Sequence, residues 1–180
     1  MAAVLACVLF IVSTVAGYLL LDNNSLASAI EPQKSPSYFS SVGHILQTNV
    51  PTALSLFAGV ITLGVAALFL LPLVGMFLGA SMNVAVSIYG PGEVVARTVL
   101  YTPFEIAGFV VAATAGVLPL VVFTRRFIAG AHSETSRNAP RNSFRQTLHS
   151  VLNTSLKLLG LSLVILVVAA FVEGFAVLQV

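Results

Sequence analysis

Charged side chains are scarce in this chain. Only 8% of its 180 residues are Asp, Glu, Lys or Arg, whereas 58% are apolar. A soluble protein covers its surface with charged residues, so a chain this poor in charge must present most of its exterior to lipid. The formal net charge of +2 is small, which argues against a nucleic-acid-binding surface. We therefore expect an all-α, polytopic membrane bundle that binds no nucleic acid.

Residues that carry catalysis or hold metals are also few. Cys7 is the only cysteine, which excludes an intrachain disulfide and a cysteine-based metal site. Asp22 is the only aspartate, which excludes an intramembrane aspartyl protease, and no His-Glu-x-x-His motif occurs. The three histidines, His44, His132 and His149, all fall in predicted loops. We expect neither an enzyme nor a bound cofactor or metal.

Apolar runs long enough to cross a membrane make up most of the chain. A transmembrane helix needs about 20 apolar residues to cross roughly 30 Å of hydrocarbon. From Pro51 to Gly92 there is no charged residue, and one helix of that length would measure about 60 Å, twice the membrane thickness. Because proline interrupts helical hydrogen bonding, we expect a reversal at Pro72, giving two full spans or a re-entrant pair. The predicted spans of this single membrane domain, 1–180, are 2–21, 51–71, 73–89, 99–122 and 158–178.

The distribution of basic residues predicts the topology. The segment 124–157 contains Arg125, Arg126, Arg137, Arg141 and Arg145 against one acid. It should be cytoplasmic, because loops rich in Lys and Arg stay on that side. The loop 22–48 has a single basic residue and should lie outside. Three spans between these loops satisfy both placements, so we expect a cytoplasmic N-terminus and an external C-terminus at the cell membrane.

Both loops carry helical patterns. Apolar residues recur at helical spacing over 38–46, which predicts either an amphipathic helix on the outer surface or an ordinary loop. On the inner side, Ser143 and Gln146 form a capping-box pattern, so an elbow helix should run into the last span. Arginines of this basic elbow, 124–157, would favour anionic headgroups by about 1 kcal/mol each, or would contact a partner protein.

Two acidic residues, Glu105 and Glu173, fall inside predicted spans. An ionised side chain at mid-bilayer costs at least ~2.5 kcal/mol, so both need partners. The predicted topology puts both in the outer third of the membrane, where they could share a proton if they face each other. Arg97, about two turns before Glu105, is an alternative counter-charge. The pair is interpreted as structural glue, as a transport or proton-coupled site, or, least favoured, as a catalytic site.

Small residues mark the helix faces that should pack. Two sets recur every four positions, namely Gly75 with Gly79, and Gly108 with Ala112 and Gly116. Such spacing lets neighbouring backbones approach closely in a membrane. The contacts are within one chain, which we favour, or between copies in a homo-oligomer. Asn83, one turn past Gly79, is expected to donate a hydrogen bond between helices rather than to bind a ligand.

Three segments have counterparts in one known family. The segment VLYTPFEIAGFVVAATAG, Val99 to Gly116, is similar to a Leu-Pro-His-Gly block followed by Glu and a helix rich in small residues. Glu105 and Gly116 match, whereas Leu100, Tyr101 and Thr102 replace Pro, His and Gly. The segment AAFVEGF, residues 169–175, is similar to a closing helix that contains Glu.

The third segment is FAGVITLGVAALFLLPLVGMFLGA, residues 57–80. It matches in its glycines, Gly59, Gly64, Gly75 and Gly79, but has Val74 where Asn is usual. From His44 onward the chain thus resembles the stage II sporulation protein M family of small polytopic membrane proteins.

The resemblance implies a non-catalytic role. Members of that family look like membrane scaffolds that assemble with cell-wall hydrolases during engulfment, and relatives lie beside transporter ATPases in bacteriocin export and immunity systems. The first hypothesis is therefore a scaffold or assembly subunit that organises partner membrane proteins. The alternative is a permease-like subunit that works with an ATPase and uses Glu105 and Glu173.

Overall fold

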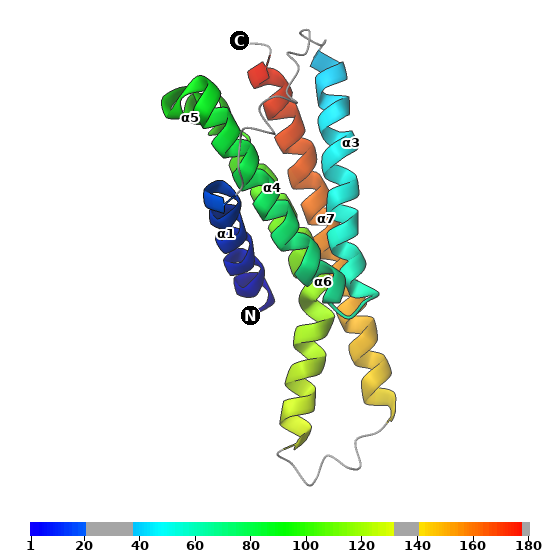
Figure 1. Ribbon diagram of the computed structural model, residues 1–180. Coiled ribbons are helices and arrows are strands. Elements are labelled where there is room, and N and C mark those ends of the chain that lie inside the picture. Colours follow the sequence, from blue (N-terminus) through cyan, green and yellow to red (C-terminus); the bar gives the residue numbers. More distant parts are fainter. Residues whose placement is uncertain (21–37, 132–140, 178–180) are drawn as a thin grey trace.

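The computed structural model describes residues 1–20, 38–131 and 141–177, and these residues form helices joined by short turns, without a β-strand. The all-α prediction is confirmed. The elements are α1 (Ala2–Leu20), α3 (Tyr38–Phe57), the 3₁₀ turn η1 (Ala58–Val60), α4 (Val65–Tyr89), α5 (Pro91–Thr98), α6 (Thr102–Ala131) and α7 (Arg141–Val177). In Figure 1 the long helices run side by side along one common direction.

Four of these helices are long and apolar enough to cross a membrane, namely α1, α4, α6 over 102–128 and α7 over 145–176. Only a minority of each apolar segment is buried inside the bundle, so the remaining apolar surface faces outward. Helices satisfy all their backbone hydrogen bonds internally, which is what a lipid environment demands. The chain is therefore a multi-pass membrane bundle. Its fifth long helix, α3, is less apolar and lies beside α7 (Figure 1).

The predicted reversal at Pro72 is wrong. Pro72 lies inside α4, which is continuous from Val65 to Tyr89. The chain instead turns between Gly59 and Gly64, where the Gly64 N–H donates to the Gly59 carbonyl at 2.6 Å and Gly64 has φ +94°. A positive φ suits a residue without Cβ. A proline in a membrane helix removes one hydrogen bond, which neighbouring helices and local adjustments accommodate.

The segment 38–46 is helical, as one of the two interpretations expected, but it is the first part of a longer helix, and Pro51 does not begin a new one. Helix α3 begins at Tyr38 and continues through Pro51. Its first turns pack on the end of α7, where the Tyr38 hydroxyl donates to the Phe171 carbonyl at 3.3 Å and Val42 lies against Gly174. Residues 22–37 of the predicted outer loop, 22–48, lie outside the described residues. Apolar residues recur over 38–46 because one side of this helix is buried against α7, and that same repeat suggested an amphipathic helix on the membrane surface.

Helix α5 lies in the interval between the spans predicted at 73–89 and 99–122. Pro91 occupies its first turn, Glu93 follows, and Arg97 lies in the last turn. These are the positions in which proline, an acid and a base each favour a helix. The Arg97 Nε donates to Glu93 Oε1 at 2.8 Å. This exposed pair holds the link between α4 and α6 in helical form.

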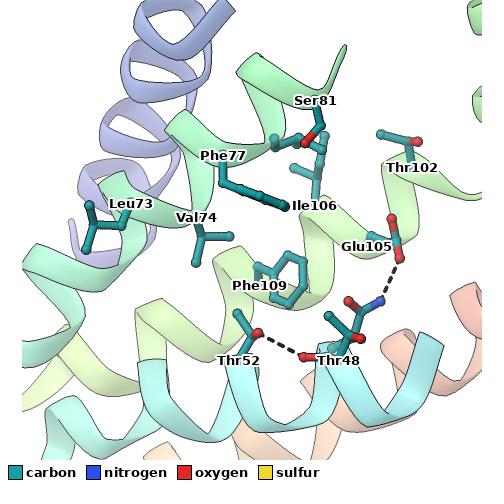
Figure 2. A pocket seen from close by; sticks show the side chains of 12 residues that line it. Thr48, Thr52, Leu73, Val74, Phe77, Ser81, Thr102, Glu105, Ile106 and Phe109 are labelled. Carbon is teal, nitrogen blue, oxygen red and sulfur yellow. Dashed lines mark hydrogen bonds between the residues drawn. The ribbon is translucent and has the colours of Figure 1, made fainter. Parts of the chain in front are cut away.

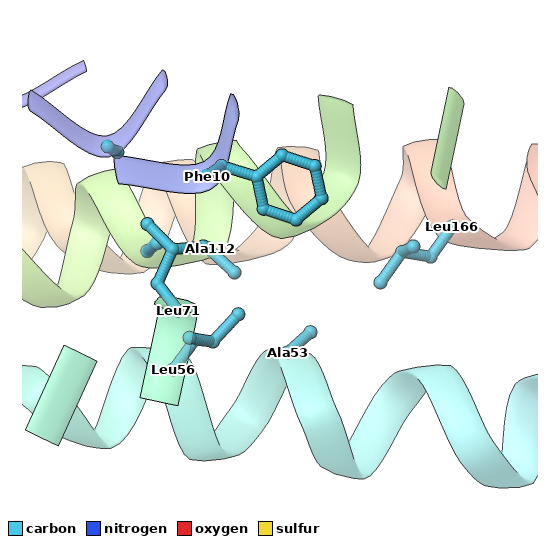
Figure 3. Close-up of a cluster of buried hydrophobic side chains, with 8 residues drawn as sticks. Phe10, Ala53, Leu56, Leu71, Ala112 and Leu166 are labelled. Atoms are coloured by element: carbon cyan, nitrogen blue, oxygen red, sulfur yellow. The ribbon is translucent and has the colours of Figure 1, made fainter. Parts of the chain in front are cut away.

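The centre of the bundle is an apolar cluster with contributions from five helices. Figure 3 shows the side chains that meet there, Phe10, Ala53, Leu56, Leu71, Ala112 and Leu166. All are at most 2% exposed. Hydroxyl groups join α6 to α7 around this cluster, because Ser162 donates to the Gly108 carbonyl at 2.8 Å and Ser155 to the Ala115 carbonyl at 3.0 Å.

Helices α6 and α7 extend past the other helices at one end of the molecule (Figure 1). The predicted elbow helix is the beginning of α7, which runs without interruption from Arg141. We define the arm as residues 124–131 of α6 and 141–154 of α7. The segment 132–140, which contains Arg137, lies outside the described residues. The arm is thus a pair of helical extensions rather than a separate helix on the membrane surface.

Candidate functional site

A cavity of about 440 Å³ lies between α3, α4 and α6. Figure 2 shows its two chemically different walls. Apolar side chains from α4 and α6 form one of them: Leu73, Val74, Phe77, Leu78, Ile106 and Phe109. Hydroxyl and amide side chains of α3, with Thr102 and Glu105 of α6, form the other, and Ser81 of α4 adds one more hydroxyl. A mostly apolar cavity with a few converging polar groups is the usual form of a small-ligand site.

Glu105 is the charged group of this cavity. The Asn49 side-chain amide of α3 donates to Glu105 Oε1 at 2.6 Å (dashed in Figure 2). Glu105 also lies in the first turn of α6, where the helix dipole favours negative charge. Its carboxylate is therefore stabilised by two interactions, namely the hydrogen bond from the Asn49 amide and the dipole at the beginning of its own helix.

Glu173 of α7 lies next to Glu105. The two carboxyl groups are close enough to interact electrostatically, so they form one acidic pair. One oxygen of Glu173, Oε2, is buried and has no hydrogen-bond partner. The structure thus brings together the two acids that the sequence places inside spans, although they lie 68 positions apart in the chain.

Tyr101, which directly precedes α6, belongs to the same cluster. Burial first, then the charges of Glu173 and Glu105, raise the pKa of Tyr101 to about 12. Its phenol group therefore stays protonated at physiological pH and can donate a hydrogen bond.

The other polar residues singled out from the sequence lie elsewhere. Arg97 pairs with Glu93 and stacks over the Tyr89 ring, its guanidinium carbon 5.5 Å from the ring centroid. The alternative that it neutralises Glu105 is therefore wrong. Asn83 of α4 donates to the Tyr18 carbonyl of α1, which is a contact between helices and lies outside the cavity.

The small residues pack within one chain. On α4, Gly75 lies against Phe10 and Ser13 of α1, and Gly79 lies against Thr14 and Tyr18. On α6, Gly108 lies against Leu166 of α7, Gly116 lies against the Leu56 carbonyl of α3, and Ala112 is fully buried. These contacts fix α1 on α4 and hold α6 between α3 and α7. The carboxyl pair and the cavity depend on that arrangement.

The basic residues lie on the arm, far from the carboxyl pair. Arg125, Arg126 and Arg145 are exposed, and the Arg125 guanidinium contacts the Met1 thioether. Arg141 begins α7, and its side chain lies outside the described part. The arm also exposes apolar residues, with Phe127 81% and Ile128 55% accessible. Its surface is therefore both basic and apolar.

Two residues of the site, Asn49 and Tyr101, are not predicted from the sequence. Asn49 falls at the border of a predicted outer loop, and Tyr101 stands out only as a departure from a family motif. A signal for Asn49 exists, since Thr48, Asn49 and Thr52 form a polar patch next to an otherwise apolar run. Once α3 is recognised as a helix through Pro51, that patch must face a neighbouring helix.

The site offers hydrogen bonding and negative charge but no metal-ligand set. Among the described residues, no group of three or more His, Cys, Asp or Glu side chains could hold a metal ion. Two carboxyl groups, an amide, a phenol and several hydroxyls can share a proton or bind a donor. Either role uses Glu105 as the group that faces the cavity.

A family model described as Stage II sporulation protein M matches residues 6–177, which is nearly the whole chain. This range includes α1, which the sequence resemblance did not cover, and all residues of the cavity and carboxyl pair. No curated protein and no solved structure matches the chain.

Proposed function

The chain belongs to the stage II sporulation protein M family, and on this premise we propose that it is a non-catalytic membrane assembly subunit that holds partner proteins through its arm. The observation that carries the proposal is the length of α6 and α7. At 30 and 37 residues they measure about 45 and 55 Å. The hydrocarbon core is about 30 Å thick, so both helices extend well into water.

The exposed surface of the arm has the residue composition of a protein interface. Phe127 and Ile128 are exposed, and arginines flank them at 125, 126 and 145. Arginine and aromatic residues are the types enriched at protein interfaces. The inner side of the arm, with Thr147 and Val151 buried, joins α6 to α7. The exposed side of the arm is accessible to a partner protein.

The orientation belongs to the same proposal. In Figure 1 the first residue and the arm lie toward one end of the bundle, and α7 finishes at the other. Arginine-rich segments stay in the cytoplasm. The arm and N-terminus are therefore assigned to the cytoplasm and the C-terminus to the outside of the cell membrane, with the arm available to cytoplasmic or membrane-bound partners.

Affinity purification in mild detergent tests the arm. The variant Arg126→Glu with Phe127→Ser should lose co-purifying proteins that the wild type retains. The matched control is Glu93→Arg with Val95→Ser, which makes similar exposed changes on α5 at the other end. Circular dichroism must show both variants folded. Equal partner recovery from the arm variant and the wild type would contradict the proposal.

The carboxyl pair favours a second candidate function. A permease-like subunit that works with an ATPase would use Glu105 and Glu173 as a site for substrate or protons. An ionisable pair beside a cavity at membrane depth supports it, since such residues often mark transport pathways. Under this reading Glu105→Gln abolishes substrate movement or immunity while the complex stays assembled. Recovery of an ATPase favours transport, and recovery of a wall hydrolase favours scaffolding.

A further inference from the structure

The cavity beside Glu105 has the size and polarity of a site for one small amphiphile. Its volume of about 440 Å³ falls within the range of about 300–1,000 Å³ found for small-ligand sites. Polar groups of α3 line one side, at Thr48, Asn49 and Thr52, and the α4 side is mostly apolar apart from Ser81 (Figure 2). A ligand that fills it needs one polar end and one hydrocarbon end.

The charge of the site indicates which chemical group the polar end of the ligand should carry. Within the described part of the chain, neither Glu105 nor Glu173 forms an ion pair with a Lys or Arg side chain, and Glu105 accepts a hydrogen bond from the neutral Asn49 amide. Glu173 Oε2 accepts no hydrogen bond. Negative charge at membrane depth without a cation is costly. A positively charged donor is therefore the complement that the cluster lacks.

The position of the cavity opening indicates the medium from which a ligand enters. Leu73 and Phe77 line the cavity and are also 60% and 71% exposed on the outside of α4. Both lie within the apolar segment of α4 that can cross a membrane. The rim therefore faces hydrocarbon rather than water, and a ligand reaches the cavity from within the bilayer.

We propose that this cavity binds a single-chain amphiphile with a protonated primary amine head. The ammonium group donates to the free acceptor positions of Glu105, and the hydrocarbon chain lies along Val74, Phe77 and Phe109. Charge-assisted hydrogen bonds of this kind are about twice as strong as neutral ones. Ligand binding requires neither the arm nor transport. The proposal is therefore independent of both the assembly function and the permease-like function.

Native mass spectrometry of the purified full chain in a non-ionic detergent tests the site, with n-decylamine as the probe and n-decanol as its neutral counterpart. One decylamine should bind per chain, at least tenfold more tightly than decanol. Glu105→Gln should weaken decylamine binding at least tenfold and leave decanol unchanged. Glu93→Gln, which alters an exposed acid on α5, is the matched control and should bind as the wild type does.

A second variant keeps the test independent of the carboxyl pair. Ser81 lines the cavity and is exposed at its rim, so Ser81→Phe should fill the space without burying a charge and should block decylamine. Three results would overturn the proposal: no decylamine adduct, equal binding of decanol, or full binding by the folded Glu105→Gln variant. The first would mean that the carboxyl pair needs no bound cation.

Discussion

Adding one methyl group to α4 at position 79 should loosen α1 from the bundle. A Cβ at Gly79 would meet the carbonyl oxygen of Thr14 and the backbone nitrogen of Tyr18. Both are backbone atoms of α1, so no side-chain rotation can make room. The two helices must move apart, and the Asn83 hydrogen bond to the Tyr18 carbonyl is expected to lengthen with them.

The size of the effect follows from two opposing contributions to stability. Overpacking a close contact costs about 1–3 kcal/mol. Replacing glycine by alanine inside a helix contributes about 0.5–1 kcal/mol in the opposite direction. Gly79→Ala is therefore expected to destabilise the protein by up to about 2.5 kcal/mol, because the cost of the clash exceeds the gain in helix propensity.

Gly160 of α7 provides the matched control. It also lies inside a helix, and nothing lies within 4 Å of its added Cβ. Gly160→Ala should therefore show only the gain in helix propensity, a stabilisation of about 0.5–1 kcal/mol. The difference between the two variants isolates the clash, about 1–3 kcal/mol.

The measurement is unfolding in mixed micelles of dodecyl maltoside and sodium dodecyl sulfate, followed by far-ultraviolet circular dichroism. The free energies of unfolding of Gly79→Ala and Gly160→Ala are compared at the same micelle composition. Equal stability of the two variants would show that α1 does not pack on α4 through Gly79, and the helix arrangement would need revision.

Three further outcomes are expected. Ser162→Ala should lose about 0.5–1.5 kcal/mol of unfolding free energy in the same assay, because its buried hydrogen bond to Gly108 disappears; an unchanged value would remove that bond from the α6–α7 contact. Gly64→Ala should cost about 1–2 kcal/mol, since alanine at positive φ is strained and its Cβ would crowd Leu120 at 2.8 Å; a neutral result would refute the glycine turn. In a background without the native cysteine, Glu93→Cys should react with an impermeant maleimide in intact cells and Arg126→Cys only after lysis, and the reverse pattern would invert the proposed topology.

Much of the fold could be predicted from composition and pattern. The span predicted at 99–122 corresponds to α6, which can cross a membrane over 102–128. The span predicted at 158–178 lies mostly within α7. The main error is the reversal at Pro72. Proline often ends a helix in water, although in a packed membrane helix the lost hydrogen bond is a local cost.

The candidate site could be predicted only in part. Glu105 and Glu173 stand out because acids are rare inside spans, and the structure brings them together. Asn49 could not be assigned to them, because the proline two positions later suggested a loop. Arg97 was a reasonable counter-charge by sequence distance, yet Glu93 is closer along the same short helix and pairs with it.

Composition and residue pattern alone are enough to assign the medium and the class of this protein. Its apolar runs and scarce charges demand lipid, and lipid admits only elements that satisfy their own backbone hydrogen bonds, which here means helices. The tertiary structure decided where the chain turns and which polar groups meet. The Gly64 turn fits against Leu120, and Asn49 reaches Glu105 across two helices. Such contacts join residues more than fifty positions apart, so no local pattern in the sequence encodes them.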